Sequence, residues 1–170
     1  MSSFNRRTLL LLPLALPITL AACGFTPAYG PKGPAQGLQG RIRPADPTDK
    51  NGFDLVTALQ ARFGRSKDPQ FALAYTISTE PVGVGYATDT SISRYNLKGR
   101  VDWSLTENAS GRRIAGGTEE NFTSWSATSA TVAGLSAEED AAERLMVILA
   151  DQIALQVIAA SARFNPQSAP

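Results

Sequence analysis

The sequence predicts an α+β fold, with two helices packed on one face of a mainly antiparallel four-stranded sheet in the order β-α-β-β-β-α. Two long stretches repeat apolar residues at steps of three and four, which indicates helices with one buried side. Between them, several stretches alternate apolar and polar residues, which is typical of half-buried strands. Helices and strands in this order are expected to form two packed layers.

The first two elements follow a segment rich in proline and glycine. A short strand is expected at 38–43, and a helix at 49–64. Asp49 or Asn51 can cap the start of this helix, and Gly64 can adopt the left-handed conformation that ends it. The expected apolar stripe consists of Phe53, Val56, Leu59 and Phe63.

Three strands are expected in the middle of the chain. Residues 71–82 alternate regularly, and Gly83 and Gly85 follow them as strand-ending residues. Residues 93–106 alternate most clearly, whereas 112–125 alternate poorly, which indicates an edge strand or a bulge. One face of the second strand is expected to carry Tyr95, Leu97, Gly99, Val101, Trp103 and Leu105.

The longest helix is expected to begin at Ser136, with Glu139 completing a capping box. Glu138 and Asp140 would then lie with Glu139 in the first turn, where the helix dipole favours negative charge. The apolar stripe that follows consists of Ala141, Leu145, Ile148, Leu149, Ile153, Val157 and Ala160.

The N-terminus has the layout of a bacterial lipoprotein. Residues 1–22 combine two arginines, a short apolar run and small residues at the end, as a cleaved signal peptide does. The sequence Leu-Ala-Ala-Cys resembles a lipobox, so Cys23 is expected to carry diacylglycerol and an N-acyl chain, with no other cofactor. The alternative is an ordinary secreted protein with a chance cysteine. The predicted organisation is a lipidated tether (23–40), one domain (41–164) and a flexible tail (165–170).

Composition excludes several classes of chemistry. The chain has no histidine and one cysteine, which excludes Ser-His and Cys-His catalysis, an internal disulfide and most transition-metal sites. With 16 basic and 15 acidic residues, it lacks the charge of a nucleic-acid-binding protein. We therefore expect no enzyme, although a hydrolase that uses carboxylates alone stays open as an alternative.

One strand face carries a row of cations that could bind a partner. Arg94, Lys98 and Arg100 share this face over about 20 Å. They could bind the anionic groups of a partner through charge-assisted hydrogen bonds. The alternative is a solvated face in which they pair with Glu119 or Glu120, each pair contributing about 0–1 kcal/mol.

The two tryptophans have different expected roles. Trp103 lies on the apolar face of its strand and is expected in the core. Trp125 lies at a strand end and is a candidate contact for a partner.

Several segments together resemble the lipopolysaccharide-assembly lipoprotein family LptE, in its alphaproteobacterial form. The similar segments are 23–30, 94–99, 122–125, 137–141 and 149–153, in the family's order. At Trp125 the family pattern leads us to expect tyrosine. Each segment by itself is a packing, capping or turn pattern, so the resemblance rests on their joint occurrence behind a lipobox.

The resemblance implies an outer-membrane lipoprotein without catalytic activity. The implied protein faces the periplasm or lies within a barrel lumen. It plugs the β-barrel LptD, helps the barrel to assemble, and assists delivery of lipopolysaccharide to the outer leaflet. Candidate contacts for lipopolysaccharide or the barrel are then Arg94, Lys98, Arg100 and Trp125. The alternative is a lipoprotein that binds another cell-envelope ligand.

Overall fold

The computed structural model describes residues 27–30, 33, 35–86, 91–127 and 130–164. The expected signal peptide, Cys23 and the expected tail lie outside these residues. The elements are β1 (Ile42–Pro44), α2 (Lys50–Phe63), β2 (Phe71–Tyr86), β3 (Ile92–Glu107), β4 (Arg113–Ser126) and α3 (Thr131–Ser161).

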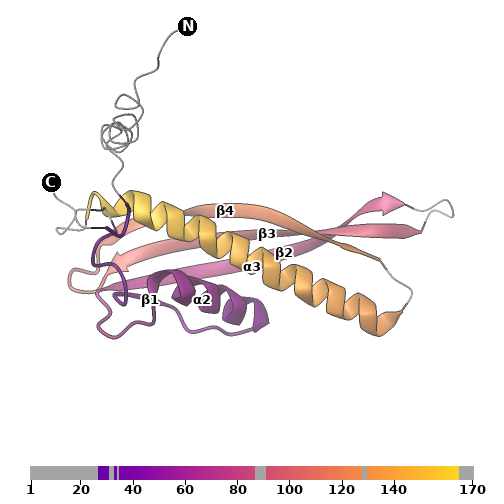
Figure 1. Ribbon diagram of the computed structural model, residues 1–170, viewed down its shortest axis with the longest axis horizontal. Coiled ribbons are helices and arrows are strands. Elements are labelled where there is room, and N and C mark those ends of the chain that lie inside the picture. The colour runs from indigo at the N-terminus through magenta and orange to yellow at the C-terminus, as the bar shows by residue number, and fades with distance from the viewer. Residues whose placement is uncertain (1–26, 31–32, 34, 87–90, 128–129, 165–170) are drawn as a thin grey trace, which may run out of the picture.

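The four strands form one mixed sheet in the order β1-β2-β3-β4. β1 pairs with β2 in parallel, whereas the β2–β3 and β3–β4 pairs are antiparallel. Figure 1 shows α2 and α3 on the same side of the sheet, with the long α3 running across the strands. The predicted fold class is therefore confirmed.

The core lies between the helices and one face of the sheet. β3 buries Leu97, Val101, Trp103 and Leu105 at this face, with Gly99 among them, whereas Tyr95 is only partly buried. α3 is long and apolar enough to cross a membrane by length and composition, and its buried side chains belong to the core of the domain. The largest fully buried side chains include Leu38, Ile42, Leu55, Leu59, Phe63, Leu73, Leu105, Leu145, Met146, Leu149 and Ile153.

Helix α2 begins and ends as predicted but buries a different set of side chains. Oδ1 of Asp49 accepts a hydrogen bond of 2.7 Å from the backbone N–H of Gly52, and Gly64 follows the helix with φ 76°. The prediction that Phe53 is buried was wrong, because Phe53 is 60% exposed. The buried side includes Leu55 and Leu59, and Phe53 lies about 160° and about 120° away from them around the helix.

Helix α3 begins at Thr131, so the predicted start at Ser136 and its capping box were wrong. The N–H of Gly134 already donates to the carbonyl oxygen of Ala130 at 2.9 Å, and Ala130 occupies the N-cap position without a side-chain hydrogen bond. The backbone hydrogen bonds of the helix thus extend through the small residues before Ser136, whose composition is typical of a connecting loop. The acids expected in the first turn, including Glu139, lie beyond it.

Strand β2 continues to Tyr86, four residues past its predicted end. The register shifts on both sides of Gly85, so the glycines mark an irregularity within the strand. The backbone groups of Phe71 and Leu73 face β1, and by alternation those of Pro81 face the same side of β2. Because β1 is short and does not reach Pro81, this part of β2 is a sheet edge, where a proline is tolerated.

The described part of the predicted tether packs on the domain. Ala35 is fully buried and Leu38 is 1% exposed. The N–H of Ala35 donates to the carbonyl of Ala28 at 2.9 Å, and the N–H of Gly40 donates to that of Phe63 at 2.7 Å. Packing therefore extends before the expected domain start at residue 41, while the short strand begins only at Ile42.

We predict that Gly99→Ala destabilises the fold. A Cβ at Gly99 would lie 2.7 Å from Cδ2 of Leu145 and 3.1 Å from Cδ1 of Leu149. Because both leucines are fully buried, the helix has to shift, and we expect a loss of about 1–3 kcal/mol in the free energy of unfolding. Gly117→Ala is the matched control, since its Cβ would have no neighbour closer than 3.6 Å. Equal denaturation midpoints for the two variants would contradict close packing at Gly99.

Candidate binding surface

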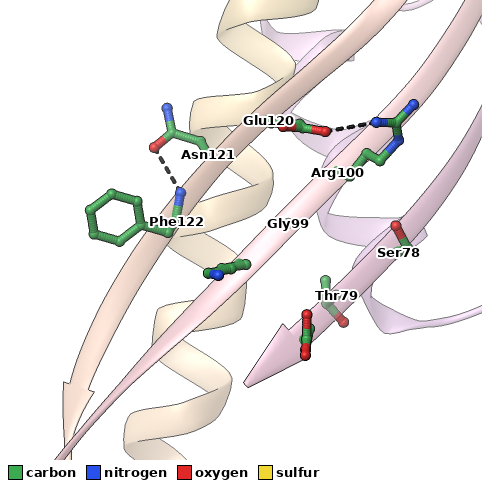
Figure 2. A pocket seen from close by; sticks show the side chains of 9 residues that line it. Ser78, Thr79, Gly99, Arg100, Glu120, Asn121 and Phe122 are labelled. Carbon is green, nitrogen blue, oxygen red and sulfur yellow. Dashed lines mark hydrogen bonds and ion pairs between the residues drawn. The ribbon is translucent and has the colours of Figure 1, made fainter. Parts of the chain in front are cut away.

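The face of the sheet opposite the helices contains a hollow of about 610 Å³. Figure 2 shows it from this side, with α3 behind the strands. Cross-strand pairing places Lys98 between Glu80 of β2 and Phe122 of β4, and Arg100 between Ser78 and Glu120. The hollow is therefore built from three strands, with Lys98 and Arg100 on the middle one.

Arg100 is held by two carboxylates on this face. Its guanidinium donates to Asp102 at 2.8 and 3.1 Å and to Glu120 at 2.7 Å. These hydrogen bonds, first those to Asp102, raise the pKa of Arg100. The alternative of a paired, solvated cation thus describes Arg100 correctly, with Glu120 as a partner. Glu119 points to the other face, where its Oε1 accepts from Nε1 of Trp103 at 3.2 Å.

Lys98 and Arg94 differ from Arg100, because neither makes an ion pair or a side-chain hydrogen bond within the described residues. Lys98 lines the hollow beside Phe122, whose side chain is 56% exposed. Arg94 lies further along β3 on the same face, opposite Ser126, and is not among the residues that line the hollow. Two cations of the predicted row are therefore available to a ligand.

Trp125 lies on the helix side of the sheet and not with the cations. Its ring stacks on Tyr95 with centroids 5.1 Å apart and planes 17° from parallel, and it packs partly buried against the core. Trp103 is 4% exposed, as expected of a core residue. The structure therefore brings Lys98 and Arg100 together, places Arg94 nearby, and separates Trp125 from them.

The sequence alone does not show that Glu80 and Phe122 are neighbours of Lys98. Both lie about 20 residues away in the chain, and only the strand register places them opposite Lys98. The poor alternation of β4 hid the fact that Phe122 points outward. No group of three or more potential metal ligands occurs in the described residues.

We predict that Asp102 contributes to the stability of the fold in a pH-dependent way. Hydrogen bonds from Arg100, and then from Thr118, lower the pKa of Asp102 below its ordinary 3.8. Because the folded pKa is depressed, the stabilisation is present above this ordinary value, which the unfolded chain has, and is lost as the pH falls through the folded pKa. Carboxyl NMR titration should show the pKa of Asp102 rising in Arg100→Gln and not in Arg94→Gln. The same titration curve in both variants would contradict the pairing.

Several solved structures share this fold. A candidate lipoprotein from Caulobacter crescentus CB15 matches with a TM-score of 0.65 and 18% identity, over 79% of this chain and 99% of that one. Lipoprotein B from Nitrosomonas europaea matches with a TM-score of 0.55 and 16% identity, over 82% and 94%. Rare lipoprotein B from Shewanella oneidensis matches with a TM-score of 0.53 and 15% identity, over 71% and 93%. At these identities the likeness shows the fold alone.

Sequence comparison identifies the family. No curated protein matches the chain in sequence. The sequence model of the LptE family, described as lipopolysaccharide-assembly, matches residues 41–157, which is most of the chain and nearly all of the folded part. The expected resemblance is thus confirmed, and the protein belongs to the LptE family of lipopolysaccharide-assembly proteins.

Proposed function

We propose that this protein is an outer-membrane lipoprotein that plugs the LptD β-barrel, helps it to assemble, and assists delivery of lipopolysaccharide to the outer leaflet. The observation that carries the proposal is the family match over residues 41–157. In this proposal Cys23 bears the diacylglycerol and N-acyl chains, and the protein faces the periplasm or lies within the lumen of the barrel. It performs no catalysis.

The uncovered sheet face supports the proposal chemically. Lipopolysaccharide presents phosphates next to acyl chains, and Lys98 lies beside the exposed ring of Phe122. A cation without an intramolecular partner can donate charge-assisted hydrogen bonds to a phosphate. Arg100 is less suited to this task, because a ligand would compete with Asp102 and Glu120 for its donors.

A carboxylate-only hydrolase has less support from the same side chains. Glu119 accepts a hydrogen bond from Trp103 on the helix side of the sheet, and Glu120 pairs with Arg100 on the opposite side. Two acids on opposite faces of one strand cannot act on the same bond as acid and base.

We predict that Arg94→Glu with Lys98→Glu weakens lipopolysaccharide binding by about 10- to 100-fold, since charge-assisted hydrogen bonds contribute about 1.5–3 kcal/mol. Binding to the purified chain can be measured by fluorescence titration, and barrel assembly by co-purification of LptD. Arg43→Glu with Arg144→Glu is the matched control, because it changes net charge equally at other exposed positions. Unchanged binding and assembly in the first variant would remove this face from the proposal.

We also predict that Cys23→Ala, exported with an ordinary signal peptide, retains partial function. The acyl chains would localise the protein, whereas the folded domain would hold the barrel. Co-purification of LptD with the tagged, non-acylated chain should therefore be reduced but detectable. Complete loss, with the domain folded in the periplasm, would show that the anchor itself is required. If even the acylated protein never co-purifies with a barrel, the result would favour the alternative of a lipoprotein that binds another cell-envelope ligand.

A further inference from the structure

The chain leaves its proposed anchor and reaches the folded domain within a few residues. Ala28 is held by its hydrogen bond to Ala35 and packs against the core. Tyr29 lines a groove with Arg62 of α2 and Leu155 of α3. Cys23 is five residues before Ala28, so the link spans at most about 18 Å. The domain therefore cannot stand far from the surface that holds Cys23.

The loops near this point of entry meet at one end of the domain. The N–H of Lys67 donates to the carbonyl of Gly40, and the N–H of Asn108 donates to that of Gln70. The rings of Phe71 and Phe164 contact each other edge to face, which brings the end of α3 to the start of β2. Figure 1 shows the end of α3 at the same end as the β3–β4 turn.

This end is rich in cations. Its residues are Arg41, Arg65, Lys67, Arg112 and Arg163, against the carboxylates of Asp68 and Glu107. Arg65, Lys67 and Arg163 are exposed, and the described residues provide no ion-pair partner for them. We call these three the basic end. Two neighbouring charges cancel each other, since Arg43 and Asp46 lie 3.6 Å apart.

The opposite end of the molecule carries a group of acids. The first turns of α3 carry Glu138, Glu139, Asp140 and Glu143, and of these only Asp140 pairs with a cation within the described chain, Arg144 at 3.0 Å. The basic end and this group of acids thus lie at opposite ends of the long axis, which favours turning the basic end towards an anionic surface.

We propose that the basic end docks on the anionic phospholipid headgroups of the membrane that carries the anchor. The inference rests on the acylation of Cys23 in the proposed function, because the short link brings this end to the headgroups. Electrostatic attraction acts within about 8 Å at physiological salt, and a lipid anchor combined with a basic patch binds more stably than one acyl chain. The barrel-binding face and the docking end would then be separate surfaces.

Sedimentation with vesicles tests this proposal without acylation or a barrel. The chain from residue 23 onward with Cys23→Ser should bind vesicles of equal parts phosphatidylglycerol and phosphatidylcholine, and not vesicles of phosphatidylcholine alone. Neutralising Arg65, Lys67 and Arg163 to Gln should lower the partition coefficient about a hundredfold, at roughly fivefold per cation. The control triple variant, with Lys50, Arg94 and Arg144 changed to Gln, should lose less than about tenfold.

Equal losses in the two triple variants, or no preference for anionic vesicles, would overturn the proposal. Either result could occur while the acylated protein still co-purifies with LptD, so failure of docking is distinguishable from failure of the proposed function. A second measurement uses the single cysteine of the sequence. With Cys23→Ser, a fluorophore on Ala162→Cys should respond to anionic vesicles, and one on Ser136→Cys should not. A response only at Ser136→Cys would also contradict docking by the basic end.

Discussion

The close approach of α3 to the middle of the sheet is the constraint on which this structure depends. Gly99 has no side chain, so Leu145 and Leu149 can lie directly against the backbone of β3. Helix α3 therefore covers β3 and β4, and α2 packs beside it. Both helices pack on the same face of the sheet. The other face is left uncovered by the described elements and becomes the only large sheet surface that a partner can reach within this part of the chain.

The cations on the uncovered face have different roles. Arg100 is occupied by Asp102 and by Glu120 of the neighbouring strand, and it helps to order the polar face. Lys98 has no such partner and lies beside Phe122. A row of similar charges along one strand therefore consists of one structural cation and others that are available to a ligand.

The point of chain entry and the exposed cations lie at the same end of the long axis of the molecule. The segment before β1 is packed on the domain at the end where the chain enters, and it shortens the link to Cys23. Because the cations gather at this end, electrostatics and the proposed lipid anchor would favour the same orientation. The two proposals thus assign separate surfaces to lipid docking and to lipopolysaccharide assembly.

The sequence by itself determined the fold class, the order of the elements and the buried face of β3, because periods of 2 and 3.6 residues record which side of an element is apolar. It also limited the cap of α2 to Asp49 or Asn51 and determined its end at Gly64, since both depend on neighbouring residues only. Only the tertiary structure decided that α3 starts at Thr131, since a helix can continue through weakly helical residues once its backbone hydrogen bonds are made. It alone placed Phe122 beside Lys98, because strand register depends on pairing between distant segments.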